Sequence, residues 1–256
     1  MIDLPPPAVL AIPAAAVGLV MGSFVTALSY RQPRAQSVAH GRSKCPGCGH
    51  TLQAVDLVPV VSWILQKGAC RYCEAPISWR YPAIELVIMV LFAVAAMTVT
   101  DGARLALLLA MTVVMVALAV VDLEQQRLPN GFLLALLLLS LAWRWSSDRD
   151  LAAGAVTAAA VFAIGVMLNA GFRSVTGRIG LGLGDAKLLA IATLALPLGP
   201  ALVFLTASGV LGLGWGLVWR RSGANAFPFG PAILASYWAS LMAGPESFER
   251  LVSRLT

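Results

Sequence analysis

The sequence predicts an all-α polytopic membrane protein, with about eight transmembrane helices and a small zinc-ribbon-like cytoplasmic domain between helices 1 and 2. Three observations predict this fold class. Of 256 residues, 59% are hydrophobic and only 12% are charged, whereas a soluble domain carries about a quarter charged residues. Apolar runs recur along the chain, several of them near the roughly 20 residues that a helix needs to cross a bilayer. One long polar segment holds all four cysteines.

Eight apolar segments are the expected spans. They are residues 8–28, 83–100, 104–121, 130–145, 151–172, 186–198, 200–219 and 228–243. The sixth is short, and its separation from the seventh depends on Pro197, Gly199 and Pro200, because proline and glycine interrupt helices. Six or seven spans are the alternative.

The basic residues predict how the chain is oriented, because Lys and Arg collect in cytoplasmic loops. With the N-terminus outside, successive cytoplasmic loops hold seven, one, three and two basic residues, thirteen in all, and the outer segments hold the other five of 18. Eight spans then place the C-terminus outside as well. This orientation explains the net charge of +6, so the expected partners include membrane lipids and exclude nucleic acid.

The organisation follows from these spans. Residues 1–28 form the first transmembrane helix, 29–82 a cytoplasmic domain, and 83–256 the remaining membrane domain. The segment 29–82 is polar, basic and rich in turn residues, and its hydrophobic stretch, 57–65, is too short to span.

Two CxxC pairs lie in this segment, Cys45-Pro-Gly-Cys48 and Cys70-Arg-Tyr-Cys73, with 21 residues between them. Such pairs are typical of a structural zinc site, because each directs two thiolates at one tetrahedral ion. Redox dithiols and incidental cysteines are the alternatives. His40 and His50 flank the first pair and are not taken as ligands.

Three acidic residues stand at or inside predicted membrane ends: Glu85, Asp122 and Asp185. An ionisable group there is costly unless it is partnered, so a function is expected. The predicted orientation places both aspartates at the cytoplasmic edge. One carboxylate could activate a water while its protonated partner donates to a scissile carbonyl, as in aspartic proteolysis. A helix end, an N-cap or a proton relay are the alternatives.

Several segments match a known family in order along most of the chain. They are Gly22-Ser-Phe-Val-Thr-Ala-Leu-Ser-Tyr-Arg31, the two CxxC pairs, Pro59-Val-Val-Ser-Trp63, Cys70 to Leu86, Val121-Asp122 before Leu128-Pro129, Gly182-Leu-Gly184-Asp185-Ala-Lys187, and Pro228-Phe-Gly-Pro231. With these motifs the chain resembles the type IV prepilin peptidase family, the GxGD intramembrane aspartic peptidases.

The resemblance implies an enzyme of the bacterial inner membrane that cuts the basic leader from type IV prepilins or pseudopilins at the cytoplasmic face. Many members then methylate the new N-terminal residue with S-adenosylmethionine. By position, Asp122 and Asp185 match the catalytic pair. The zinc-binding cysteines of the family match Cys45, Cys48, Cys70 and Cys73. No residues for the methyl donor are predicted, since the sequence has no glycine-rich nucleotide fingerprint.

Two departures and two rival functions complete the prediction. The family often has Asn where Thr26 stands and Asp where Asn130 stands, which puts the methyltransferase half in doubt. A proton-coupled transporter or a non-enzymatic pilus assembly factor with a zinc-stabilised domain are the alternative functions. Glu85 is read either as a helix cap or as a contact for the basic leader. Lys187 is read either as a membrane anchor or as a neighbour that influences Asp185.

Overall fold

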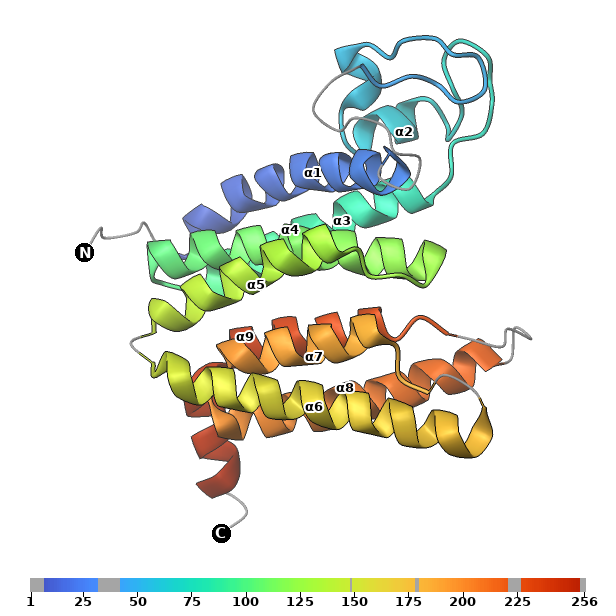
Figure 1. Ribbon diagram of the computed structural model, residues 1–256. Coiled ribbons are helices and arrows are strands. Elements are labelled where there is room, and N and C mark those ends of the chain that lie inside the picture. Colours follow the sequence, from blue (N-terminus) through green and yellow to red (C-terminus); the bar gives the residue numbers. More distant parts are fainter. Residues whose placement is uncertain (1–6, 32–41, 148, 178–179, 221–226, 254–256) are drawn as a thin grey trace. The chain divides into compact units, whose positions relative to one another are not determined.

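The computed structural model describes residues 7–31, 42–147, 149–177, 180–220 and 227–253 (Figure 1). Within these residues the secondary structure is helical, apart from two isolated β-bridges. Residues 32–41, which belong to the predicted cytoplasmic domain, lie outside the described residues. The chain divides into two compact units, residues 1–117 and 118–256, and α4 (Gly102–Gln125) passes from the first to the second.

In the first unit, α1 (Pro7–Arg31) packs along α3 (Arg80–Thr98). Glycines make the close packing possible. A Cβ atom added at Gly18 would lie 2.8 Å from the Met89 Cα, and one added at Gly22 would lie 2.5 Å from the Glu85 Cα. Small residues four positions apart let two membrane helices bring their backbones together.

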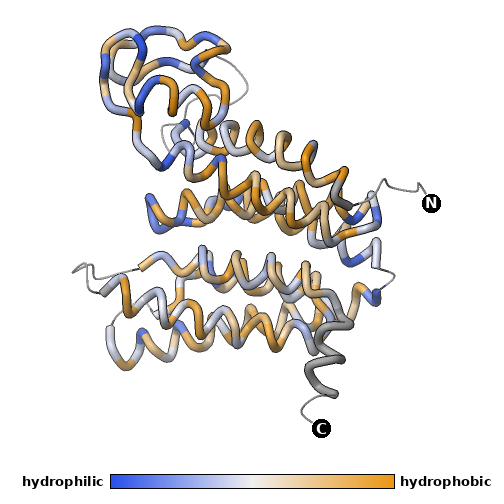
Figure 2. The backbone as a smooth tube through the Cα atoms, turned by 180° about the vertical axis from the view of Figure 1, so that it is seen from behind, coloured by the Kyte–Doolittle hydropathy of each residue, from blue (hydrophilic) through white to orange (hydrophobic). Residues whose placement is uncertain are grey.

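Between α1 and α3 lies a small polar module, whose described part is residues 42–79 and which holds more hydrophilic residues than the helices around it (Figure 2). Its helical parts are η2 (Ala54–Leu57) and α2 (Val61–Leu65). The apolar stretch 57–65 therefore forms short helical segments in the structure, in line with the expectation that it is too short to span.

The two CxxC pairs adopt the same turn. Cys45 N–H donates to the His50 carbonyl and Cys70 N–H to the Ala75 carbonyl, five residues on in each case. A bridge closes each turn, Lys44 with Thr51 and Ala69 with Pro76. The residue four positions after the first cysteine has a positive φ in both turns, 71° at Gly49 and 59° at Glu74. Glycine adopts this conformation at no steric cost, which explains Gly49.

The second unit contains the end of α4 and five further helices. They are α5 (Asn130–Trp145), α6 (Leu151–Thr176), α7 (Leu183–Ala195), α8 (Leu198–Arg220) and α9 (Gly230–Ser253). The short helix α7 contacts α5, α6, α8 and α9, and Leu188, Ala192 and Ala195 on it are fully buried. The chain therefore surrounds α7 with helices, which places the residues at its N-terminus in a constrained setting.

A helix occupies each of the eight predicted spans. The break between α7 and α8 is at Leu196 and Pro197, slightly before the predicted boundary, and Gly199 and Pro200 lie in the first turn of α8. Five of the helices, α1, α3, α4, α6 and α8, are long and apolar enough to cross a membrane, and α5 is a shorter apolar helix. These helices fit an integral membrane protein. The count of eight crossings stays a prediction, because α7 has only 13 residues.

Candidate active site and cysteine cluster

Asp122 lies in the last turn of α4 and is only 4% exposed. Its Oδ2 accepts a hydrogen bond of 2.9 Å from the backbone N–H of Gly230, the first residue of α9. A helix N-terminus carries partial positive charge and unpaired N–H groups, so it stabilises a carboxylate. The structure thus gives the buried Asp122 a specific partner from the Pro228–Pro231 motif.

Asp185 lies in the first turn of α7, three residues after the N-cap Gly182. Its carboxylate turns back and accepts the backbone N–H of Gly182, as the third helical residue does in a capping box. A Cβ atom at Gly182 would lie 2.8 Å from the Asp185 Oδ2. Gly182 therefore leaves the space in which the carboxylate sits.

The second motif glycine has a different neighbour. A Cβ atom at Gly184 would lie 3.2 Å from the Leu128 Cβ, so this glycine lets the start of α7 pack against the segment that joins α4 and α5. The same segment follows Asp122 closely in the sequence. Gly184 thus helps to bring the start of α7 next to the end of α4.

The two aspartates, 63 positions apart in the sequence, are brought together in the second unit, where their carboxyl groups are close enough to interact electrostatically. Each carboxyl group also accepts a hydrogen bond from a backbone N–H at the start of a helix. Two neighbouring carboxyl groups that share one proton are suited to activate a water and to protonate a carbonyl in the same reaction.

Lys187 forms a hydrogen bond to a neighbouring helix. Its Nζ donates a hydrogen bond of 3.0 Å to the Oδ1 of Asn130, which links the start of α7 to the start of α5. Asn130 is the position at which the resembled family often has Asp. In this chain the asparagine side chain supplies the acceptor for the lysine.

Glu85 belongs to the first unit, on α3. It is 6% exposed, and its Oε2 accepts a hydrogen bond of 2.7 Å from the backbone N–H of Val60. The reading as a helix cap is wrong, because α3 begins at Arg80 and its first turn contains no acidic residue. The carboxylate instead connects α3 to the polar module.

The four cysteines gather at one point of the polar module. Their sulfur atoms all lie within 4.8 Å of one another, and Cys45 Sγ is 3.8 Å from Cys73 Sγ. Tetrahedral zinc with bonds of about 2.3 Å to sulfur separates its thiolates by about 3.8 Å. A disulfide would need about 2.05 Å. The cluster can therefore hold a metal ion, and four thiolates are the ligand set of a closed, structural zinc site.

The space around the cluster accounts for the other glycine of the first pair. A Cβ atom at Gly47 would lie 3.1 Å from the Ala75 Cβ and 3.6 Å from the Cys73 Sγ. The φ of Gly47 is not positive, so close packing of the two CxxC turns explains this glycine, and a left-handed backbone does not.

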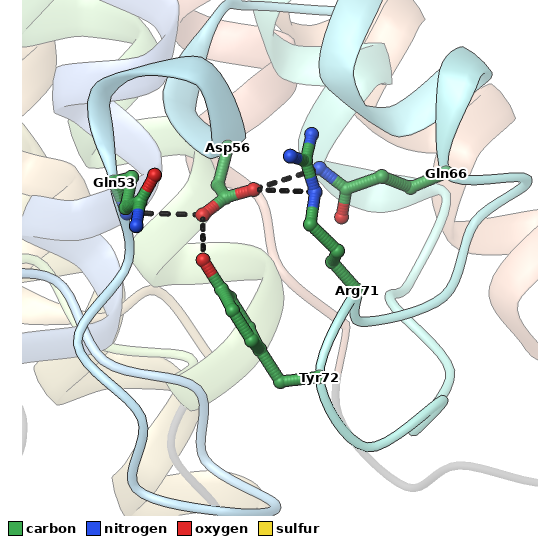
Figure 3. A network of polar contacts seen from close by, with 5 residues as sticks. All are labelled: Gln53, Asp56, Gln66, Arg71 and Tyr72. Carbon is green, nitrogen blue, oxygen red and sulfur yellow. Dashed lines mark hydrogen bonds and ion pairs between the residues drawn. The ribbon is translucent and has the colours of Figure 1, made fainter.

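The sequence reasoning missed Asp56, which is the centre of a polar network in the module (Figure 3). Its buried carboxylate accepts hydrogen bonds from the Gln53 backbone, Gln66 and Tyr72, and it pairs with Arg71 at 3.2 Å. Partial desolvation and the hydrogen bond to Asp56 raise the pKa of Tyr72, so the hydroxyl remains a donor at neutral pH. The spacing of Asp56 from the second CxxC pair matches no known motif, so the sequence did not indicate this network.

Tyr72 also provides a contact for the side chain of His50. The two rings stack with their centroids 3.7 Å apart, which joins the first CxxC turn to the second. Among the described residues, the group close enough together to hold a metal ion consists of the four cysteines.

The fold and the site define a helical membrane protein with an aspartate pair at two helix ends and a four-cysteine cluster in a polar module. Residues 16–99 match the bacterial Peptidase A24 N-terminal domain, and residues 109–217 match the type IV leader peptidase family. The chain belongs to the type IV leader peptidase family.

Curated relatives support this assignment. A prepilin leader peptidase/N-methyltransferase of Aeromonas salmonicida (strain A449) is 36% identical, over 79% of this chain and 72% of the relative. Proteins of the same name are 30% identical in Dichelobacter nodosus, over 89% of this chain and 90% of the relative, and 31% identical in Neisseria gonorrhoeae, over 89% of both chains. No solved structure matches this chain.

Proposed function

We propose that this protein is an aspartic endopeptidase that removes the basic leader from type IV prepilins or pseudopilins and then methylates the new N-terminus. The observation that carries the proposal is the aspartate pair, since Asp122 and Asp185 come from different helices and interact in one unit. The names of the relatives, prepilin leader peptidase/N-methyltransferase, support both activities.

In this mechanism Asp122 and Asp185 hold one proton between them. The ionised carboxylate takes a proton from the attacking water, while the protonated carboxyl group donates to the carbonyl oxygen of the scissile peptide bond. The N–H of Gly230 and the N–H of Gly182 orient the two carboxyl groups. Breakdown of the tetrahedral intermediate then passes a proton to the leaving amine, which becomes the N-terminus of the mature pilin.

The proposed reaction takes place at the cytoplasmic face of the bacterial inner membrane. A prepilin leader is basic and its cleavage point adjoins an apolar helix, so an active site at the membrane edge suits the substrate. The excess of basic residues in the loops that follow the odd-numbered predicted spans supports this orientation.

The cofactors have separate roles. Zinc held by Cys45, Cys48, Cys70 and Cys73 stabilises the polar module, which is too small to build a large core of its own. S-adenosylmethionine supplies the methyl group for the second activity when it is bound.

The test of the peptidase is cleavage of a model prepilin by membranes that contain the wild-type chain, Asp122→Asn or Asp185→Asn. General acid–base catalysis contributes about 10²–10⁴-fold to a rate, so each variant is expected to lose at least about 100-fold in cleavage. Asp101→Asn is the matched control, because Asp101 is exposed and its carboxylate accepts a local hydrogen bond from the backbone N–H of Arg104.

Mass spectrometry of the product N-terminus reads out both activities. If the wild-type product carries no added methyl group, the proposed methyltransferase activity is wrong. Full cleavage by either Asp→Asn variant would remove the aspartic mechanism and would favour an assembly or transport role for the chain.

A further inference from the structure

The first unit contains a cavity of about 650 Å³ that none of the proposed peptidase chemistry uses. It lies where the end of α1 and the start of α3 meet the polar module, and all three contribute to its wall. Pockets for cofactors and other small molecules have volumes of about 300–1,000 Å³. The cavity is therefore large enough for a nucleoside-sized ligand.

Three kinds of side chain in the cavity lining are suited to hold a ligand. Aromatic rings come from each of its walls: Tyr30 of α1, Trp63 of α2 and Tyr81 of α3. The carboxylate of Glu85 lies on the α3 side, and the guanidinium groups of Arg31 and Arg42 also contribute. Trp63 is held in place by a hydrogen bond of 3.0 Å from its Nε1 to the Ile77 carbonyl. The wall thus offers flat apolar surfaces, an anion and cations.

The backbone next to Glu85 is strained in a way that orients this carboxylate. Val60 has φ 60° and ψ −49°, a γ-turn closed by a hydrogen bond of 2.6 Å from Val61 N–H to the Pro59 carbonyl. Positive φ is rare and energetically costly for a β-branched residue. The turn directs the Val60 N–H onto Oε2 of Glu85 at 2.7 Å, and such strain is typical of functional sites.

We propose that this cavity binds S-adenosylmethionine, the methyl donor, with Glu85 facing its positively charged part. The proposal rests on the methyltransferase half of the proposed function. A purine stacks on aromatic rings, a sulfonium or ammonium group pairs with a carboxylate, and the donor's own carboxylate pairs with Arg. The cavity supplies all three partners.

The mixed charge of the wall favours this ligand over the basic leader of the substrate. Glu85 and Asp56 are accompanied by Arg31, Arg42 and other cations, and Asp56 is already occupied by its four contacts within the module (Figure 3). A zwitterionic ligand satisfies both signs of charge, whereas a polybasic peptide meets repulsion from the cations.

The methyl transfer needs no further reagent. The lone pair of the deprotonated N-terminal amine forms a bond to the methyl carbon, the carbon–sulfur bond breaks, and its electron pair stays on sulfur as a neutral thioether. The amine then loses one proton to solvent. Only binding of the donor is assigned to the cavity.

The test is isothermal titration calorimetry of S-adenosylmethionine and S-adenosylhomocysteine against the purified full-length chain in detergent with its metal bound. Two variants alter the cavity independently: Glu85→Gln removes the charge, and Ala27→Trp fills the space from α1. Matched controls are Glu74→Gln on the same module and Val20→Trp on the exposed face of α1, neither of which lines the cavity.

We expect the Kd for the donor to rise at least tenfold in both cavity variants and to stay at the wild-type value in both controls. Glu85→Gln should weaken binding of the donor, whose sulfur is positively charged, more than binding of the product, whose thioether sulfur is uncharged. Wild-type affinity in Ala27→Trp and Glu85→Gln would overturn the proposal and place the donor elsewhere.

Product masses from the wild type separate the two failures. If the wild type methylates its product and both cavity variants bind the donor with wild-type affinity, only the proposed binding site is wrong. If the wild type cleaves the prepilin but neither methylates the product nor binds the donor, the methyltransferase function is wrong, and the proposed binding site is wrong with it.

Discussion

At the residue scale, both aspartate carboxyl groups lie against glycines. A Cβ atom would come within 2.6 Å of the Asp122 Oδ2 at Gly230 and within 2.8 Å of the Asp185 Oδ2 at Gly182. Contacts that short do not occur between a methyl group and an oxygen. Glycine at these positions therefore allows each carboxylate to reach its backbone N–H, and the positions serve the geometry of the pair rather than the flexibility of a loop.

This geometry predicts the effect of Gly230→Ala. The added methyl group would displace the Asp122 carboxylate, and displacement by about 1 Å can cost about 100-fold in rate. We expect cleavage of a model prepilin to fall by about 10- to 100-fold at an unchanged expression level.

Gly209→Ala in α8 is the control, because nothing lies within 4 Å of a Cβ atom there. Both substitutions remove one helical glycine, so a comparable loss in the control would mean that helix stability, and not the carboxylate position, limits the rate.

At the scale of the helices, a buried arginine joins three of them. Arg144 near the end of α5 is 5% exposed. It donates to the Leu194 and Leu196 carbonyls at the end of α7 and to the Asp150 carbonyl at the start of α6, at 2.7–3.2 Å. The negative end of the α7 dipole also favours this cation. Sequence reasoning counted Arg144 only as an outer basic residue.

We expect Arg144→Met to destabilise the membrane domain. Hydrogen bonds to charged groups contribute about 1.5–3 kcal/mol, and their loss leaves carbonyls at the end of α7 without these donors. The midpoint of thermal unfolding in detergent is expected to fall by several degrees.

Arg173→Met removes an exposed arginine from the last turn of α6 and should leave the midpoint within about a degree. Equal midpoints for the two variants would show that the Arg144 contacts contribute little to stability.

The polar module is a second element whose stability can be tested. Four thiolates and two matching turns form its centre, and a module of this size depends on metal for much of its folding energy. We expect about one zinc per purified chain, and less than half of that in Cys45→Ser or Cys73→Ser, together with faster proteolysis between α1 and α3.

His50→Gln is the matched control for the zinc prediction, because His50 stacks on Tyr72 outside the cluster. It should keep its zinc. Acidification should release the metal, since protons compete for the thiolates. Full zinc content in a variant that lacks Cys45 and Cys73 together would exclude the site.

At the scale of the whole molecule, the open question is how many helices cross the membrane. Eight helices correspond to the eight predicted spans, although the lengths of α5 and α7 are below that of a simple span. An even number of crossings places both termini on one side, and an odd number separates them.

Reporter fusions distinguish the two cases. With both termini outside, alkaline phosphatase fused after residue 256 should be active and green fluorescent protein fused there should be dark. The opposite pattern is expected for a fusion within the polar module. A fluorescent C-terminal fusion would mean an odd number of crossings.

Sequence patterns alone predicted the class of protein, the helices, the polar module, the cysteine cluster and the family. The length of apolar segments and the spacing of CxxC pairs are local patterns, so they can be recognised without a structure. Sequence reasoning also proposed Asp122 and Asp185 as a pair, because both were expected at one edge of the membrane.

Which side chains and backbone groups contact one another could be seen only in the folded protein. Gly230 with Asp122, Glu85 with Val60, Arg144 with the end of α7, and the contacts of Asp56 all join residues whose spacing forms no period. The cavity beside Glu85 arises where two helices and the module converge. Such contacts depend on how helices pack in three dimensions, and the periodicity of one helix carries no information about its neighbour.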